Sequence, residues 1–516
     1  MMKPIAWSAG LRMLRDRFSS CIAVSDASHR QLTYSDLHDR AHTLARFLVA
    51  TGIQPGQPYG TLFPNAVDAV WASYGVRMSG AADVPISWRS TPEEIAWFAR
   101  LSGFTHVVTV PGRLADLEAL GLTAVSSEEV LRPSYAQKSD DDLPAIPADQ
   151  CGRVLFTSGT TGKPKGVQYT HGARWIGEQM LKASMPFVPS PGDKILLMTP
   201  FVHGSSLLTY AWCDFGAEVV LIDGVDLPFI TRLLDSAEPC AIFAPPTVLA
   251  KITAGFEGRH FEHVKCIFTG TQPLTAALYQ RARKMFGPVV RITYGKSECV
   301  NPITVLSTSE TEAYFSQAQI GPGACVGYPA PGVEIKIHAN TDADAEPGDD
   351  GEVLLRAPQM SECLLNESGR IEHAEGGWHH TGDLGHFDQA GRLILTGRIA
   401  DVIKTGGYRV NPDEIEAVLA TIDGAGQICV ASLPSDYWGE IIIAVAEYPP
   451  AGWIELAKEK LSGLSKHKHP RLFVEMDALP RNPQGKVSRR NVRAAVLSRF
   501  DLLDGAYPEI KPKFDC

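Results

Sequence analysis

The N-terminal part of the chain alternates between two hydrophobic periods. In its first helical stretch, apolar side chains recur every three or four positions: Leu37, Ala41, Leu44, Ala45 and Leu48. Thr33 is placed to cap the start of this helix, and Gly52 ends it. A short strand at 61–63, a helix over 66–78 and a strand beginning at Val84 follow. This alternation predicts an α/β domain with a largely parallel sheet.

Size and composition narrow the class of protein. With 516 residues the chain is too long for one ordinary core, so we expect two or more domains. It is 44% hydrophobic and 21% charged, as globular proteins are, and no stretch approaches the roughly 18 apolar residues of a membrane span. The net charge of −10 argues against general nucleic-acid binding. The 10 cysteines form no C-x-x-C pair, and without an export signal we expect reduced thiols in the cytoplasm.

A stretch rich in glycine, hydroxyl and lysine side chains follows a predicted buried strand at 154–156. It contains Thr157, Ser158, Gly159, Thr160, Thr161, Gly162, Lys163 and Lys165. Glycine lets the backbone approach a ligand, and backbone amides, hydroxyls and ammonium groups together suit a polyphosphate. The stretch is not the P-loop of GTPases, because Pro164 stands where that motif has its Mg²⁺-binding hydroxyl. Its composition alone also fits an ordinary surface loop.

Further motifs follow in order along the chain. They are a Tyr-Gly turn with an acidic end at 294–298, a Gly-Asp turn at 382–383, a glycine-containing block at 397–416 and a loop around Lys486. Together with 157–166, these motifs closely resemble the signatures of the adenylate-forming superfamily. That superfamily contains acyl- and aryl-CoA synthetases, adenylation domains of peptide synthetases and firefly-type luciferases. The resemblance covers roughly residues 30–495 and is strongest to an acyl- or aryl-CoA synthetase.

The resemblance implies a fold and a division into domains. We expect an α/β protein with a large N-terminal domain of layered α/β subdomains plus a small β-barrel, followed by a small mobile α+β lid. The N-terminal adenylation domain would span 1–399 and the lid 400–516. Ala400 takes the place of the family's pivot, which is usually Asp or Lys. Because alanine keeps ordinary backbone freedom, we expect Ala400 to act as the hinge as well.

The resemblance also implies roles at a nucleotide site. Beyond the stretch 157–166, the ATP site would include Gly270, Tyr294, Ser297, Asp383 and Arg398. Tyr294 would stack on the adenine, Asp383 would accept hydrogen bonds from the ribose hydroxyls, and Glu298 would bind a Mg²⁺ ion that bridges the phosphates. Read alone, an aspartate in a turn is common and needs no ligand.

His203 and Lys486 are the two residues with expected catalytic roles. His203, in an aromatic-x-His sequence, would border the carboxylate pocket, although a histidine in such a position is more often structural. Lys486 occupies the place of the family's lysine that stabilises charge during adenylation. The turn Gly406–Gly407 lacks side chains and would let the pantetheine arm of CoA pass. Asp214 lies beyond the position where amino-acid-activating members hold an ammonium group, so an amine-free acid is favoured.

These inferences predict an acid-thiol ligase that uses ATP, Mg²⁺ and coenzyme A. The enzyme would join a carboxylic acid to AMP with release of pyrophosphate, and then transfer the acyl group to CoA. A carrier protein is an alternative acceptor, and a homodimer is compatible with the sequence. A luciferase-like enzyme and a nucleotide-binding protein without catalysis are further alternatives. The sequence leaves the acid unidentified.

Overall fold

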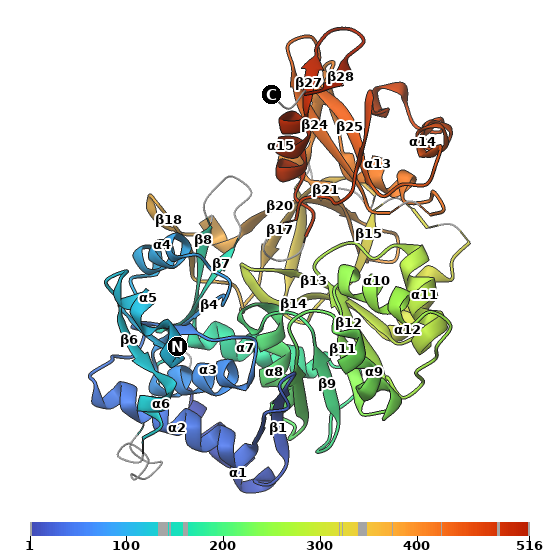
Figure 1. Cartoon of the computed structure of the whole chain (residues 1–516). Helices are drawn as coiled ribbons and strands as arrows, with labels where there is room; N and C mark the ends of the chain where they lie inside the picture. Colours follow the sequence, from blue (N-terminus) through green and yellow to red (C-terminus); the bar gives the residue numbers. More distant parts are fainter. Residues whose placement is uncertain are drawn as a thin grey trace. The chain divides into compact units, whose positions relative to one another are not determined.

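The chain forms two compact units (Figure 1). The computed structural model describes residues 3–132, 143, 146–157, 164–318, 320–321, 323–338, 348–373, 375–424, 426–481 and 486–513. The first unit comprises residues 1–317, 326–334 and 356–379, and the second comprises residues 318–325, 335–355 and 380–516. The predicted boundary at residue 400 concerns a lid movement and stays a prediction.

One sheet of the first unit contains parallel strands in the order β13, β12, β11, β9, β10, β1, with β14 and β2 antiparallel at its sides. The strands are β1 (Ile22–Asp26), β2 (Gln31–Thr33), β9 (Lys194–Leu197), β10 (Glu218–Leu221), β11 (Pro239–Phe243), β12 (Cys266–Gly270), β13 (Val290–Lys296) and β14 (Cys299–Leu306). The final residues of β15 (Ala324–Pro329) pair with β14. Because parallel strands run in one direction, the segments after β9, β11, β12 and β13 share one edge of this sheet.

A second sheet of the first unit has the order β6, β5, β3, β4, β7, β8, β18, β19. The strands are β3 (Pro58–Leu62), β4 (Ala82–Ile86), β5 (His106–Thr109), β6 (Thr123–Ser126), β7 (Cys151–Thr157), β8 (Lys165–Thr170), β18 (Cys363–Asn366) and β19 (Gly369–Ile371). The members from β3 to β7 run parallel, and β8, β18 and β19 each run antiparallel to their neighbour. The strand β7 leads into the glycine-rich stretch.

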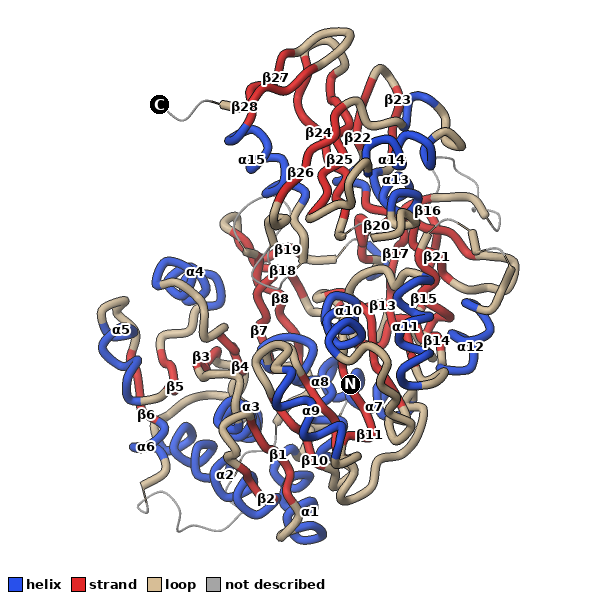
Figure 2. The backbone as a smooth tube through the Cα atoms, turned by 45° about the vertical axis from the view of Figure 1, so that its right-hand side comes forward, coloured by secondary structure: helices blue, strands red, loops and turns tan. Residues whose placement is uncertain are grey.

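Helices α2 (Tyr34–Ala50) and α3 (Val67–Ser79) lie side by side in the first unit (Figures 1 and 2). Thr33 and Asp36 cap each other's backbone amides at the start of α2, which forms a capping box. Gly80 ends α3 with a left-handed φ of 87°. These observations confirm the predicted cap at Thr33 and the predicted helix over 66–78. The apolar face of α2 joins the main core of the unit, which includes Trp71 and Trp212.

The remaining helices cover the strands of the first unit (Figure 2). They are α1 (Trp7–Phe18), α4 (Pro92–Ser102), α5 (Leu114–Glu118), α6 (Ser127–Val130), α7 (His171–Ala183), α8 (Ser206–Cys213), α9 (Leu227–Asp235), α10 (Pro246–Gly255), α11 (Ala276–Phe286) and α12 (Thr308–Phe315). A π-helical turn, Phe201–Ser205, immediately precedes α8.

The first strands of the second unit come from separate segments of the chain. In sheet order they are β16 (Glu334–His338), β17 (Gly351–Arg356), β20 (His379–Phe387) and β21 (Leu393–Arg398). The last two are antiparallel, so Asp383 lies opposite Arg398. This register brings together two residues that are 15 positions apart in the sequence.

A second sheet completes this unit, with helices on both faces. Its strands are β22 (Ile403–Thr405), β23 (Tyr408–Val410), β24 (Ile428–Ser435), β25 (Gly439–Glu447) and β26 (Leu472–Met476). Alternate residues of β25 face opposite ways: Ile442 packs with α13 (Pro412–Leu419) and α14 (Trp453–Leu461), and Ile443 packs with α15 (Arg489–Arg499). A hairpin, β27 (Phe500–Leu503) and β28 (Glu509–Pro512), follows α15.

The α/β class is thus confirmed, with a large N-terminal unit and a smaller α+β unit. Within the described part of the chain, no helix combines the length and apolar character needed to cross a membrane.

Candidate active site

The segments that follow β12 and β13 lie next to each other at one edge of the first sheet. Gly270, the last residue of β12, is paired with Thr293 in β13. A Cβ atom at residue 270 would collide with the Thr293 carbonyl oxygen, so this position requires glycine. Thr271 follows with a left-handed φ of 72°, which turns the chain sharply. Tyr294 lies one residue beyond Thr293 and is 7% exposed.

The turn after Tyr294 is held through its backbone. The Tyr169 hydroxyl donates to the Ser297 carbonyl, and the Ser361 amide donates to the Glu298 carbonyl at 2.8 Å. Ser297 is exposed and Glu298 is half-buried. Because these bonds use the backbone, they leave the Glu298 carboxylate outside the scaffold of the turn.

Glu298 fits Mg²⁺ by the chemistry of its donor atoms, since this ion prefers hard oxygen ligands. Across the described residues, no group of three or more His, Cys, Asp or Glu side chains forms a metal cage. Mg²⁺ typically binds through one or two carboxylates together with phosphate oxygens and water. A single carboxylate would match that mode of binding if phosphate oxygens and water completed the coordination.

The glycine-rich stretch begins and ends at neighbouring positions of the second sheet. Thr157, which ends β7, pairs with Lys165, which begins β8. The ring of Phe156 stacks on Phe98 with centroids 4.0 Å apart, and Trp97 donates its indole N–H to the Pro164 carbonyl at 2.8 Å. The predicted strand at 154–156 is confirmed, since it lies within β7. The predicted phosphate contacts Ser158, Gly159, Thr160, Thr161, Gly162 and Lys163 lie outside the described residues.

The turn that contains His203 is a π-helical segment at the end of β9. Asn65 accepts a hydrogen bond from the Phe201 amide at 2.8 Å and donates to the Ile222 carbonyl at 2.9 Å. Ser205 closes the turn through its hydroxyl, which donates to the Thr199 carbonyl at 2.9 Å. Segments of this kind occur often at functional sites. The structure places the backbone of His203 at the edge shared with Gly270, but it does not describe the side chain.

Asp214, the residue compared above with an ammonium-binding aspartate, is paired with a lysine of the first unit. Its carboxylate forms an ion pair with Lys182 at 2.5 Å. This pairing agrees with the expectation of an acid without an amine.

Asp383 and Arg398 form an ion pair in the second unit. Arg398 Nε lies 3.1 Å from Asp383 Oδ1, and the Asp383 side chain is 6% exposed whereas that of Arg398 is 50% exposed. Thr381 accepts a hydrogen bond from the Asp383 amide at 3.0 Å. The two residues predicted to contact the ribose or phosphate are therefore together, and Arg398 holds the carboxylate in one orientation.

Ala400 lies in a short exposed turn, Ile399–Asp401, directly after β21. Its neighbour Asp401 forms an ion pair with Arg489 at 2.6 Å. Arg489 also pairs with Glu416 at 2.8 Å and with Asp413. The chain beyond Ala400 is thus attached to α13 and α15, while the methyl side chain of Ala400 can form neither an ion pair nor a hydrogen bond.

Burial and the neighbouring Asp413 charge raise the pKa of Glu416 to about 7, against the opposing charge of Arg489. The Glu416 carboxylate also accepts a hydrogen bond from the Val430 amide at 2.7 Å. Three carboxylates around one guanidinium carry more negative charge than the guanidinium balances. A proton on Glu416 offsets part of this excess.

The Gly406–Gly407 turn connects β22 to β23. Both residues have a left-handed φ, 55° and 82°, which favours glycine. The Gly406 amide donates to the Trp438 carbonyl at 2.9 Å, and a Cβ atom at residue 406 would lie 3.0 Å from the Trp438 ring. Trp438 stacks under the Arg471 guanidinium, 3.5 Å from the ring centroid. The turn is narrow because a tryptophan fills the space beside it.

Lys486 lies just before α15 and is half-buried. Val487 forms an isolated bridge with Arg481, which brings the two ends of the Lys486 loop together. Ser488 then caps α15 by accepting from the Asn491 amide at 3.3 Å. The rest of the predicted loop, residues 482–485, lies outside the described residues.

Sequence reasoning missed several supporting residues. Asn65 orients the His203 turn, Arg489 attaches the segment after the pivot, and Trp438 fills the space beside Gly406. Arg489 and Trp438 carry weak sequence signals, because a single arginine or tryptophan has many uses. The signal for Asn65 was a Pro-Asn pair between a predicted strand and a predicted helix.

Comparisons with known proteins bear on the family. A profile described as "AMP-binding enzyme" matches residues 15–365. A (methyl-dioxo-octahydroindenyl)propanoyl:CoA ligase of Rhodococcus jostii (strain RHA1) is 27% identical over 95% of this chain and 99% of its own. A 2-succinylbenzoate–CoA ligase of Bacillus cereus (strain AH820) is 26% identical over 91% of this chain and 95% of its own.

A solved structure shows the same fold. The o-succinylbenzoate CoA synthetase of Bacillus subtilis, in complex with an acyl-adenylate intermediate, superposes with a TM-score of 0.82. It is 24% identical and covers 96% of this chain and 99% of its own. The profile match extends over more than half of the chain and includes the glycine-rich stretch and the Tyr294 turn. The predicted family is confirmed: the chain belongs to the family of AMP-binding enzymes.

Proposed function

We propose that the chain is an ATP-dependent acid:CoA ligase that forms an acyl-adenylate and converts it to a CoA thioester. The observation that carries this proposal is the shared edge of β12 and β13. There the obligatory glycine at 270, the buried Tyr294 and the half-buried Glu298 follow adjacent strand ends. The curated relatives that match nearly the whole chain are CoA ligases, which supports the same reading.

In the first half-reaction, a carboxylate oxygen of the acid attacks the α-phosphorus of ATP, and the bond to pyrophosphate breaks. Positioning and charge stabilisation supply most of the catalysis in such phosphorus chemistry. Tyr294 would hold the adenine and Asp383 the ribose. Lys486 would offset negative charge that grows on the phosphate oxygens. A bound Mg²⁺ ion would supply further charge neutralisation when held by Glu298.

In the second half-reaction, the CoA sulfur attacks the acyl carbonyl and AMP departs with the bonding electrons. AMP is a good leaving group, so the protein need not supply a nucleophile. We assign the thiol path to the Gly406–Gly407 turn and the change of state to a rotation about Ala400. The turn suits a narrow pantetheine arm because its glycines carry no side chains.

The identity of the acid is the first quantity to measure. Pyrophosphate release with ATP and Mg²⁺ should be screened over short, medium, long-chain, aryl and polycyclic carboxylic acids, with amino acids as a matched negative group. The proposal expects release with at least one amine-free class and with no amino acid. Release only with amino acids would contradict the reading of Asp214 and of the substrate class.

The acceptor is a separate proposal. CoA is our first choice, and the phosphopantetheine arm of a carrier protein is the alternative. A competition assay that offers both thiols to the preformed acyl-adenylate decides between them. A cytoplasmic location and a homodimer also remain proposals, which cell fractionation and light scattering would test.

A further inference from the structure

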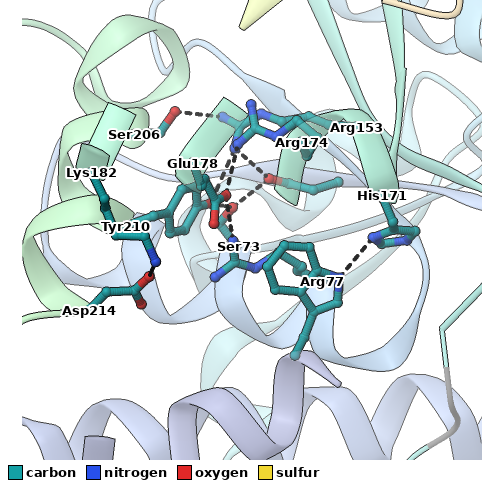
Figure 3. A network of polar contacts seen from close by, with 12 residues as sticks. Ser73, Arg77, Arg153, His171, Arg174, Glu178, Lys182, Ser206, Tyr210 and Asp214 are labelled. Atoms are coloured by element: carbon teal, nitrogen blue, oxygen red, sulfur yellow. Dashed lines mark hydrogen bonds and ion pairs between the residues drawn. The ribbon is translucent and has the colours of Figure 1, made fainter. Parts of the chain in front are cut away.

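Three arginines meet around a small cavity in the interior of the first unit (Figure 3). Arg77 on α3, Arg153 on β7 and Arg174 on α7 are 8%, 2% and 4% exposed. The cavity has a volume of about 10 Å³. It is also lined by Asp83, Gly152, His171 and Tyr210. A charged group in such a place is costly unless an opposite charge or hydrogen bonds balance it.

Two of the three arginines have close carboxylate partners. Arg77 lies 2.8 Å from Glu178, and Arg153 lies 3.3 Å from Asp83. Arg153 also donates to the Tyr210 hydroxyl at 3.2 Å and to the Ser206 hydroxyl at 3.1 Å. Each of these two guanidiniums thus has one carboxylate oxygen at short range, although the Nε atoms of Arg77 and Arg153 make no hydrogen bond among the described residues.

The Asp83 carboxylate already makes three polar contacts. It accepts hydrogen bonds from Ser73 at 2.5 Å and from Thr61 at 3.0 Å, in addition to the Arg153 contact. Its single charge already offsets that of Arg153, so none is left to offset a second guanidinium.

Arg174 is the one of these three arginines that has no carboxylate oxygen as close as those of the other two. Its nearest carboxylate oxygen, on Glu178, is 3.8 Å away and already accepts from Arg77. Within the described part of the chain, the Arg174 side chain makes no hydrogen bond, and its guanidinium lies 5.8 Å from the centroid of the Tyr210 ring. Three guanidiniums thus face two carboxylates, which leaves one positive charge in excess.

The neighbouring titratable groups do not remove this excess. Lys182 and Asp214 form their own ion pair at 2.5 Å, so they add no net charge. The Trp7 indole donates to His171 Nδ1 at 3.1 Å, so the proton of the neutral ring lies on Nε2, 3.1 Å from the Gly80 carbonyl. Burial lowers the pKa of His171 to about 4, which keeps the ring neutral near pH 7.

Arg174 itself stays charged. Burial, followed by the charge of Arg153, lowers its pKa to about 10, which still leaves the guanidinium protonated at neutral pH. Burial also raises the pKa of Glu178, and any proton that Glu178 gains would increase the positive excess. Neither shift restores electrical balance inside the cavity.

We propose that this cavity is a binding site for one small monoatomic anion, chloride in ordinary salt, which the Arg174 guanidinium holds. A volume of about 10 Å³ admits one water-sized particle and excludes a polyatomic anion such as phosphate. The anion neutralises the third guanidinium, where the low surrounding dielectric makes the attraction strong. It also stabilises the contact that Arg153 makes between β7 and the start of α8.

The contact of Arg153 with Ser206 connects the anion site to two segments of the candidate active site. The strand β7 leads into the glycine-rich stretch, and α8 directly follows the turn that contains His203. Arg153 joins the two through its bond to Ser206. The anion would therefore stabilise β7 and α8, which lead into and follow segments of the candidate active site, without contacting a substrate.

Thermal unfolding of the whole chain tests the site with chloride alone. Chloride should replace gluconate at constant ionic strength, with the melting temperature as the readout. A ligand of the folded state raises stability with the logarithm of its concentration. We expect the melting temperature to rise by about 1–2 °C for each tenfold increase in chloride above the dissociation constant, because a chain of this length has a large unfolding entropy.

The matched variants are Arg174→Gln and Lys182→Gln, which each remove one positive charge from the same helix. Arg174→Gln should lose the chloride dependence, and Lys182→Gln should keep it. Equal melting temperatures in chloride and gluconate for the parent, or an unchanged chloride response in Arg174→Gln, would overturn the proposal.

Diffraction provides a second measurement that does not depend on the folding of any variant. Crystals of the parent grown in bromide should show an anomalous peak beside the Arg174 guanidinium. A peak-free cavity that contains only water would refute the site.

Discussion

Each unit contains a network of ion pairs, which is buried in the first unit and half-buried in the second, and the two networks carry opposite charge imbalances. In the first unit, Arg77, Arg153 and Arg174 face two carboxylates. In the second unit, the single guanidinium of Arg489 faces three carboxylates, Asp401, Asp413 and Glu416. An excess of guanidinium can be balanced only by an added anion, because arginine does not release its proton. An excess of carboxylate can be balanced by a proton.

The two networks also support different parts of the proposed reaction. The first joins the strand before the glycine-rich stretch to the helix after the His203 turn. The second attaches the segment after Ala400 to the start of α15, three residues beyond Lys486. Changes in the second network should therefore act on the lid, whereas Lys486 should act on the chemistry alone.

The largest expected effect is that of Lys486→Ala. Removing one preorganised charge from the transition state should slow acyl-adenylate formation by about 10²–10³-fold. Thioester formation from supplied acyl-adenylate should persist, because Lys486 serves only the first half-reaction. Lys460→Ala, which removes an exposed lysine of the same unit, is the control. Equal losses in the two half-reactions would show that Lys486 is not specific to adenylation.

Arg489→Met should destabilise the second unit by about 3 kcal/mol, since it leaves partly buried carboxylates without their cation. Arg174→Met in the first unit should cost much less, because it removes the charge that has no close partner. Hydrogen exchange read by mass spectrometry separates the two units. Comparable losses of protection for the two variants would contradict the difference between the networks.

The pH dependence should have opposite signs in the two units. The folded-state pKa of His171 is depressed to about 4, so its contribution is present above about pH 6.5 and declines as the pH falls towards 4. Over that range the loss is at most about 3 kcal/mol. The folded-state pKa of Glu416 is raised to about 7, so its contribution is present below about pH 4.5 and is lost as the pH rises through 7.

Unfolding free energies between pH 4.5 and 8 for the parent, His171→Gln and Glu416→Gln measure these slopes. The two contributions change in opposite directions over nearly the same pH range, so each variant should reveal the slope of the other group. The stability of His171→Gln should fall more steeply than that of the parent as the pH rises from 4.5 to 7, and the stability of Glu416→Gln should fall more steeply as the pH drops from 7 to 4.5. A variant with the same pH profile as the parent would show that its residue contributes nothing to the pH dependence.

The smallest expected effect concerns the C-terminal hairpin. Asp504 accepts hydrogen bonds from the Ser435 hydroxyl and the Asp436 amide, both at 2.6 Å, and the Gly505 carbonyl accepts from the Trp438 indole at 3.0 Å. These bonds hold the tryptophan beside the proposed thiol path. Asp504→Ala should slow the CoA-dependent step by no more than about tenfold and leave adenylation unchanged. Asp501→Ala in the same hairpin is the control, and a slower adenylation step would contradict a role limited to the thiol path.

The sequence predicted those features that local physical chemistry determines. Thr33 and Gly80 delimit helices because a hydroxyl cap and a left-handed residue act within a few positions of themselves. Asn411 caps α13 in the same local way, directly before Pro412 at the first position of the helix. The α/β class followed from periodicity in the same way.

Local sequence patterns could not predict contacts between residues that are far apart in the sequence. Asp383 and Arg398 were assigned to the nucleotide site separately, and only the register of β20 and β21 shows that they form a pair. Arg153 and Arg174 gave no sequence signal, because a lone arginine is normally a solvated surface residue. Their burial depends on how α3, α7 and α8 pack, which no local pattern encodes.

The most direct test of the proposed function is a single-turnover experiment on the parent chain. With ATP, Mg²⁺ and an acid that releases pyrophosphate, quenched samples should contain acyl-adenylate before CoA is added. Adding CoA should then consume the acyl-adenylate and yield AMP and the acyl-CoA thioester in equal amounts. If acyl-adenylate accumulates and CoA leaves it intact, while a phosphopantetheine arm on a carrier protein removes it, the chain is not a CoA ligase.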